Sequence, residues 1–237
     1  MLNRKKYALL CIILSVAVIV CAVGLSRIGT DLAVWNAEPA NLPIFIIDAG
    51  HGGEDGGTTD PAGRKESEIN LEIALRLRDL MILLGARTSM IREEDVSVDT
   101  EGSGIAARKV SDIRNRVRIV EETPNSRLIS IHQNYYPEGK YRGAQVFYSH
   151  TAGSMSWAES LQEILTTQVD PGNHRECKAA GEIYLLQHIH CPGILVECGF
   201  LSNREEAALL QESSYQKKLA AAIACCAIRE PEEPNEV

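Results

Sequence analysis

Short apolar runs alternate with longer stretches of helical periodicity along most of this 237-residue chain. The apolar runs are 44–48 (IFIID), 86–91 (ARTSMI), 127–132 (RLISIH), 143–149 (GAQVFYS) and 193–200 (GILVECGF). The helical stretches are 66–85, 107–122, 156–169 and 215–228. Buried strands separated by helices are typical of a parallel sheet that is covered on both faces. We therefore expect a single three-layer α/β domain with a mostly parallel, twisted sheet and helices on both faces.

The N-terminal segment has a different pattern, because three basic residues precede an uncharged, apolar run over 7–26. A run of about 20 apolar residues can span the ~30 Å hydrocarbon core of a bilayer as a helix. Basic residues before such a run favour a cytoplasmic N-terminus and export of the rest of the chain. The expected organisation is a signal peptide or membrane anchor over 1–26, a linker over 27–42, one folded domain over 43–229 and an acidic tail over 230–237. We expect the domain to lie on the outer face of the cytoplasmic membrane.

Charge and cysteine content exclude several classes of function. The chain has 24 Lys and Arg against 32 Asp and Glu, and an acidic surface argues against a nucleic-acid partner. The cysteines after the leader are odd in number, which rules out a complete disulfide framework, and no C-x-x-C pair supports a Cys-only zinc site. Cys225 and Cys226 lie in an apolar helical stretch, where we expect small buried thiols.

The first predicted strand runs directly into a glycine-rich loop, DAGHGGEDGG, at residues 48–57. One interpretation is a phosphate cradle, but Glu54 and Asp55 would repel a phosphate and no G-x-x-x-x-G-K-[ST] motif is present. A second interpretation is a turn-rich loop with an incidental histidine. A third is a metal site, in which a compact loop lets His51 approach an ion and leaves room for substrate.

Other polar residues stand near the predicted strand ends and favour the metal site. His132 closes the run LISIH, Glu197 lies within ILVECGF, and Glu66 begins the first long helical stretch. In parallel sheets, functional sites form at the carboxyl ends of strands. Two histidines and one glutamate can bind the zinc ion of a hydrolase, which lowers the pKa of a bound water towards ~7. Because the candidates are scattered and no H-E-x-x-H motif is present, spacing alone leaves the zinc interpretation open.

The motifs together resemble a known enzyme family. From about Pro43 to Ile228, the segments DAGHGGEDGG, KESEINLEIALRLRDLMILLGARTSMIREED, LISIHQN, GAQVFYS and GILVECGFLSNREEAALL are similar in order and spacing to the zinc-dependent N-acetylmuramoyl-L-alanine amidases of the type 3 class. The resemblance implies a Zn²⁺ enzyme that hydrolyses the amide between N-acetylmuramic acid and L-alanine in peptidoglycan. It also implies that His51, Glu66 and His132 are the zinc ligands and that Glu197 is the catalytic glutamate.

The resemblance further implies a mechanism and partners. Glu197 would take a proton from the attacking water and pass it to the departing alanine nitrogen. Gly193 and Gly199 either leave backbone room for a glycan strand or simply turn the chain. A short membrane-targeted chain of this layout resembles the amidases that form muramic-δ-lactam in the spore cortex for germination, together with a muramic acid deacetylase and, in some species, a lipoprotein partner. The resemblance implies that the exported domain lies on the outer face of the cytoplasmic membrane or in the cell-wall or spore-cortex space.

Two alternative functions stay open from the sequence. One is a catalytically silent protein on the same fold that binds peptidoglycan or recruits a partner, and the other is a zinc peptidase of stem peptides. Tyr135 and Tyr136 either stack on sugar or pack within a loop. His188 and His190 could share one face of an extended segment and mimic a metal pair, while Arg92 either lines the rim of the site or pairs with a neighbouring acidic residue.

Overall fold

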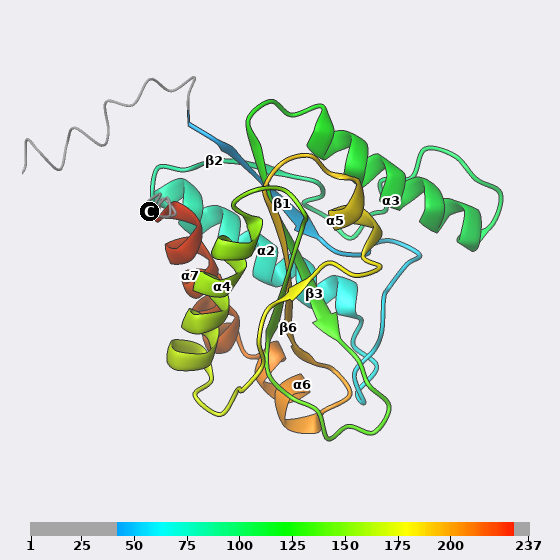
Figure 1. Ribbon diagram of the computed structural model, residues 1–237. Coiled ribbons are helices and arrows are strands. Elements are labelled where there is room, and N and C mark those ends of the chain that lie inside the picture. Colours follow the sequence, from blue (N-terminus) through cyan, green and yellow to red (C-terminus); the bar gives the residue numbers. More distant parts are fainter. Residues whose placement is uncertain (1–41, 230–237) are drawn as a thin grey trace, which may run out of the picture. The chain divides into compact units, whose positions relative to one another are not determined.

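The computed structural model describes residues 42–229, in which a six-stranded sheet has helices on both faces (Figure 1). The predicted leader over 1–26, the linker up to residue 41 and the tail over 230–237 lie outside the described residues. No helix within the described part is long and apolar enough to cross a membrane.

The sheet is mixed. Its strands are β1 (Ile44–Ala49), β2 (Arg87–Met90), β3 (Ser126–Asn134), β4 (Gln145–Tyr148), β5 (Lys178–Ala179) and β6 (Gly193–Phe200), in the spatial order β2-β1-β3-β6-β4-β5. The first four strands in that order are mutually parallel, whereas β4 is antiparallel to β6 and parallel to β5. The α/β domain is confirmed, and the run predicted over 143–149 forms β4, which together with β5 runs opposite to the other four strands.

Helices cover the two faces of this sheet unequally. The larger apolar layer packs beneath α2 (Glu66–Leu83), α4 (Ser154–Ile164) and α7 (Ser213–Ile228). The π-helical segment η2 (Leu165–Val169) continues α4, and α6 (Arg204–Gln211) precedes α7. The opposite face carries α3 (Ile105–Glu121) and the short α5 (Tyr184–His188) over a smaller cluster.

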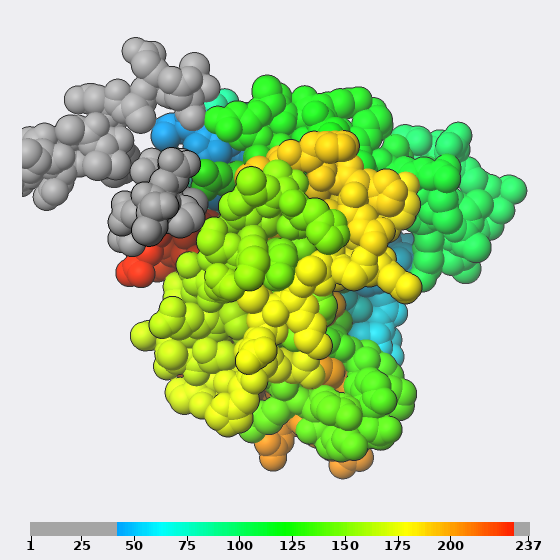
Figure 2. Space-filling view, viewed as in Figure 1, coloured from blue at the N-terminus to red at the C-terminus, as the bar shows by residue number. Residues whose placement is uncertain are grey.

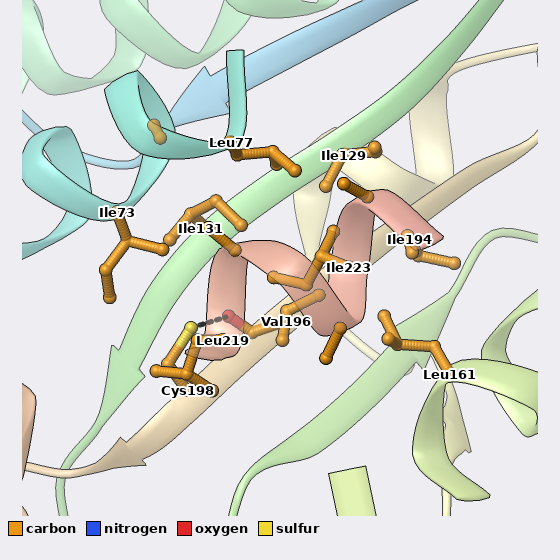
Figure 3. Close-up of a cluster of buried hydrophobic side chains, with 14 of the residues drawn as sticks. Ile73, Leu77, Ile129, Ile131, Leu161, Ile194, Val196, Cys198, Leu219 and Ile223 are labelled. Atoms are coloured by element: carbon orange, nitrogen blue, oxygen red, sulfur yellow. Dashed lines mark hydrogen bonds between the residues drawn. The ribbon is translucent and has the colours of Figure 1, made fainter. Parts of the chain in front are cut away.

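The larger cluster holds the strands against α2 and α7. In Figure 3, Ile73 and Leu77 of α2 point towards Ile131 of β3, and Leu219 and Ile223 of α7 lie beside the strands. All five side chains are fully buried. Each such burial contributes about 1.5–3 kcal/mol, so this layer makes β1, β3 and β6 a rigid platform for the residues at their ends.

The helical stretch predicted over 107–122 forms α3, but its apolar residues are only partly buried. Val120 is buried, but Val110 is 47% exposed, and the helix instead buries the guanidinium of Arg116. The reason is that Arg116 finds a carboxylate and backbone carbonyls beneath α3, which satisfy its charge. The prediction for α7 needs a similar correction, because Cys226 is buried whereas Cys225 faces solvent.

Candidate metal centre

His51, Glu66 and His132 meet at the carboxyl ends of β1 and β3. One donor atom from each residue lies within 4.8 Å of the other two. Oε1 of Glu66 is 3.3 Å from Nε2 of His51 and 3.1 Å from Nδ1 of His132, and the imidazole centroids are 5.0 Å apart. Two imidazoles and one carboxylate converging in this way could hold a divalent metal ion.

The carboxylate of Glu66 is fixed by backbone donors. Only 4% of the residue is exposed. Its Oε2 accepts the N–H of Thr58 at 3.0 Å, and its Oε1 accepts the N–H of Gln133 at 3.1 Å. Burial raises the pKa of Glu66, but the hydrogen bonds and charges of the two imidazoles outweigh burial and lower it. Glu66 is therefore an ionised, oriented ligand candidate at the start of α2.

His51 is oriented by a second carboxylate. Its Nδ1 lies 2.9 Å from Oδ2 of Asp55, which leaves Nε2 facing Glu66. Burial lowers the pKa of His51, but the hydrogen bonds to Asp55 and Glu66 outweigh it and raise the pKa to about 9. A carboxylate behind a ligand histidine is the usual arrangement in metal sites, where it sets the tautomer and the ring orientation.

A buried ion pair supports the backbone that carries His51. Arg116 and Asp48 are 2% and 1% exposed, and Nη1 of Arg116 donates to the Asp48 carboxylate. Arg116 also donates to the carbonyl oxygens of Ala49 at 3.0 Å and of His51 at 2.7 Å. His51 has a positive φ of 61°, which is uncommon for a residue with a side chain, so these contacts hold an unfavourable turn in place.

Arg92 supports the same turn from the other side. Its guanidinium donates to the carbonyl oxygens of Ala49 at 2.7 Å, Gly50 at 3.0 Å and Ser67 at 2.8 Å. Arg92 is 3% exposed, so it does not line the rim, and its N–H groups donate to backbone carbonyl oxygens and form no ion pair with an adjacent acidic residue in the described part of the chain. The sequence did not indicate Arg116 as a site residue and indicated Arg92 only for the rim, because arginine is ordinarily a surface residue and no local pattern marks a buried one.

The glycines of the loop make room for the other site residues. A β-carbon on Gly50 would lie 2.2 Å from Nε2 of His132, and one on Gly57 would lie 2.5 Å from Oε2 of Glu66. At Gly52 it would lie 2.2 Å from the carbonyl oxygen of Val96. The loop therefore packs directly against the candidate ligands, which explains its glycine content better than a phosphate cradle does.

Gly193 and Gly199 serve packing. A β-carbon on Gly193 would lie 2.5 Å from Cδ1 of Ile189, and one on Gly199 would lie 3.2 Å from Cδ1 of Leu210. A side chain at either position would point into protein, so the interpretation that they leave room for a glycan strand is wrong. Both glycines lie within β6, so neither forms the alternative turn.

Glu197 lies beside the three candidate ligands. It is paired with His132 in the register of β3 and β6. Its Oε2 is buried and has no hydrogen-bond partner among the described residues. Burial raises the pKa of Glu197 to about 7, with Glu66 adding to the rise and His132 opposing it. A carboxyl group with a pKa near neutrality can both accept and donate a proton.

The remaining histidine candidates do not form a metal pair. His188 stacks on Tyr184 with ring centroids 3.8 Å apart, and Nδ1 of His190 lies 2.7 Å from Oε2 of Glu121. The prediction of a shared extended face fails because His188 belongs to α5.

Tyr184 also lines a cavity of about 160 Å³ together with His51 and His132, a role that no sequence signal indicated.

Comparison with known proteins identifies close relatives. A family model described as N-acetylmuramoyl-L-alanine amidase matches residues 45–229. The germination-specific N-acetylmuramoyl-L-alanine amidase of Bacillus subtilis is 39% identical over 194 residues, which cover 78% of this chain and 80% of that protein. The amidase AmiC of Neisseria meningitidis is 28% identical over 77% of this chain, which spans about half (51%) of that protein. The structure of the CwlD amidase from Clostridioides difficile in complex with the GerS lipoprotein is similar with a TM-score of 0.75 at 37% identity, over 78% of this chain and 96% of that one.

Proposed function

Because this chain belongs to the N-acetylmuramoyl-L-alanine amidase family of peptidoglycan hydrolases, we propose that it is a zinc enzyme that cleaves the amide between N-acetylmuramic acid and L-alanine. The observation that carries the proposal is the convergence of His51, Glu66 and His132 beside the unpartnered carboxyl oxygen of Glu197. A silent binding protein would have no need of this arrangement, whose burial of an unsatisfied polar atom costs free energy.

The donor set fits a catalytic zinc ion. Zinc hydrolases use three protein ligands, and two histidines with one glutamate are a known set. The ionised carboxylate of Glu66 and the support of His51 by Asp55 match what such a site requires. When bound, zinc would supply a Lewis acid for the amide carbonyl and would lower the pKa of a water molecule.

Glu197 is our candidate for the proton-transfer group. Its pKa of about 7 allows it to take a proton from the attacking water and to deliver it to the nitrogen of L-alanine, which must be protonated to leave. His51, Glu66 and His132 act as ligands, and Asp55 holds the His51 ring in orientation. Arg116 and Arg92 keep the carbonyl groups of the loop in place and do not touch the reacting atoms.

We extend the proposal to the place of action. The germination-specific name of the Bacillus subtilis relative supports a spore-cortex substrate, with muramic-δ-lactam formed together with a muramic acid deacetylase. The lipoprotein in the Clostridioides difficile complex supports a lipoprotein partner. The proposed organisation is a leader over 1–26, a linker over 27–42, the zinc amidase domain over 43–229 and an acidic tail over 230–237, with the domain working outside the cytoplasmic membrane.

Digestion of peptidoglycan tests the function. The purified protein would be incubated with cortex and vegetative peptidoglycan, with added zinc or with a chelator, and new N-termini would be labelled and identified. We expect new N-terminal L-alanine that depends on zinc. New N-termini from other residues of the stem peptide would indicate a peptidase. Zinc-loaded protein that cleaves neither wall would indicate a missing partner or another substrate, and protein with neither zinc nor activity would support the silent alternative.

A further inference from the structure

Arg175 lies outside the metal centre and next to the proposed proton-transfer group. Its position follows from the sheet, because Gln145 of β4 is directly opposite Glu197 of β6 and Nη1 of Arg175 donates to Oε1 of Gln145 at 2.5 Å. Directly opposed side chains of antiparallel strands lie on the same face, about 5 Å apart at their β-carbons. Gln145 therefore brings the guanidinium of Arg175 to the side of the Glu197 carboxyl group.

The guanidinium is held rigidly before any substrate binds. Its Nε donates to the carbonyl oxygen of Arg142 at 3.0 Å, and its Cζ lies 4.6 Å from the ring centroid of Phe200. The amide of Gln145 is itself fixed, since its Nε2 donates to the carbonyl oxygen of Glu176 at 2.8 Å. An arginine fixed in this way loses little conformational entropy when it binds an anion.

The charge of Arg175 acts on Glu197, whose pKa it lowers against the larger effect of burial, but not through a direct contact. Arg175 forms no ion pair with a carboxylate in the part of the chain that the structure describes, and its Nη2 has no hydrogen-bond acceptor there. The neighbouring Arg142 differs, because its Nη2 lies 3.2 Å from Oδ2 of Asp170. Arg175 is only partly buried, so its free N–H groups can be reached from solvent.

The order of the strands places Arg175 on one side of the reaction. The candidate ligands come from the ends of β1 and β3 and the start of α2, Glu197 comes from β6, and Arg175 is held by β4, in the spatial order β1-β3-β6-β4. Under the proposed function, Glu197 delivers a proton to the nitrogen that stays with the peptide. A group on the far side of Glu197 from the metal centre therefore faces the peptide and not the sugar.

We propose that Arg175 binds a carboxylate of the stem peptide, the free α-carboxylate of the glutamate residue that follows L-alanine, and so determines which peptidoglycan is cleaved. The guanidinium fork matches a carboxylate with two parallel hydrogen bonds. This inference rests on the proposed function. Phe200, next to Arg175, begins a row of aromatic rings. The ring centroids of Phe200 and Tyr141 are 6.3 Å apart, and those of Tyr141 and Tyr136 are 4.7 Å apart. Both tyrosines are exposed enough to contact a peptide.

Figure 2 shows the surface on which this peptide would lie. The green loop after β3 and the yellow segment before β5 are exposed on the same face of the molecule. Arg142 of the loop contacts Arg175 and Asp170 of the segment, and these contacts hold the two together.

The test compares two walls that differ in one group. The full-length protein would digest glycan strands of equal length whose stem peptides carry either a free α-carboxylate or a carboxamide at the glutamate residue, and kcat/KM would be measured from new L-alanine N-termini. The wild-type protein should prefer the carboxylate about tenfold or more, as expected for a charge-assisted hydrogen-bonded pair. In Arg175→Gln this preference should fall to about one, mainly through KM, and Arg175→Lys should keep part of it.

A matched control and two contrary outcomes complete the design. Arg142→Gln removes a nearby cation that is paired with Asp170 and should leave the preference at its wild-type value. Circular dichroism and zinc content report whether the Arg175 variants are folded. If Arg175→Gln lowers cleavage of both walls equally, Arg175 is structural and the inference is wrong. If the wild-type protein binds no zinc and cleaves neither wall, the proposed function itself is wrong.

Discussion

The backbone of Gly50 lies against the imidazole of His132, so that a β-carbon on Gly50 would be 2.2 Å from Nε2 of the ring. Gly50 follows the last residue of β1, and His132 belongs to the neighbouring β3. The carbonyl oxygen of Gly50 also accepts hydrogen bonds from Arg92 at 3.0 Å and from Asn70 at 3.1 Å, so this backbone cannot move away. The position of His132 therefore requires that residue 50, at the end of the neighbouring strand, has no side chain.

Substitution of Gly50 by alanine should therefore displace His132 and weaken metal binding. We expect Gly50→Ala to lower zinc affinity by about 10–100-fold, the range found when groups that orient metal ligands are lost. Competition with a fluorescent zinc chelator measures the change. Gly172→Ala, in an exposed turn at an ordinary φ, is the control, and equal zinc affinity of Gly50→Ala and the wild-type protein would show that the ring can move without cost.

Substitution of Glu197 should separate metal binding from turnover. Glu197→Gln keeps the shape of the side chain but cannot exchange a proton, so kcat should fall by about 10²–10⁴-fold while zinc content stays near one per chain. Inductively coupled plasma mass spectrometry and the N-terminal L-alanine assay give the two values. Normal turnover in this variant would remove Glu197 from the mechanism.

Zinc binding should release a proton from His51 near neutral pH. In the metal-free protein the pKa of His51 is raised to about 9, so the ring is protonated at pH 7 and must lose its proton to bind zinc. The apparent zinc affinity should therefore rise with pH up to about 9. Calorimetric titration in buffers of different ionisation enthalpy counts the proton. In Asp55→Asn the pKa of His51 should be lower, so fewer protons should be released at pH 8; an unchanged count would contradict this role of Asp55.

The buried pair of Asp48 and Arg116 should contribute to stability above acidic pH. Burial raises the pKa of Asp48, but the charge of Arg116 and the hydroxyl of Ser130 outweigh it and lower the pKa. Between the unfolded pKa, about 3.9, and the lower folded pKa, the unfolded state binds more protons, so the contribution is present above pH ~4 and is lost as the pH falls.

Variants of this pair test the contribution through the free energy of unfolding. Asp48→Asn should flatten the fall in stability between pH 6 and pH 3, as measured by urea denaturation. Arg116→Met leaves Asp48 buried without its partner and should destabilise the protein by about 3–5 kcal/mol at pH 7. Arg118→Met, at an exposed arginine of the same helix, is the matched control. A loss in Arg116→Met no larger than in the control would contradict the structural role of Arg116.

Most elements, although not β5, α5 and α6, and the position of the candidate site were predictable from the sequence. The apolar steps from Ile69 to Leu77 identified α2, and the β-branched runs identified β1, β3 and β6, because hydrophobic periodicity is a local property. The same runs placed His51, His132 and Glu197 near strand ends, and parallel strands end at one edge of a sheet. Residue types together with element order therefore indicated an α/β domain and left a metal site open, and the resemblance to the amidase family selected His51, Glu66 and His132 as its ligands.

Only the tertiary structure decided which polar side chains support and surround that cluster. Arg116 meets Asp48 across 68 positions of sequence, and Arg175 meets Gln145 across 30. The reversal of β4, which places Gln145 opposite Glu197, depends likewise on strand pairing. Such contacts arise from the register and crossing of distant elements, and an arginine that is buried by them carries no local signal that distinguishes it from an arginine on the surface.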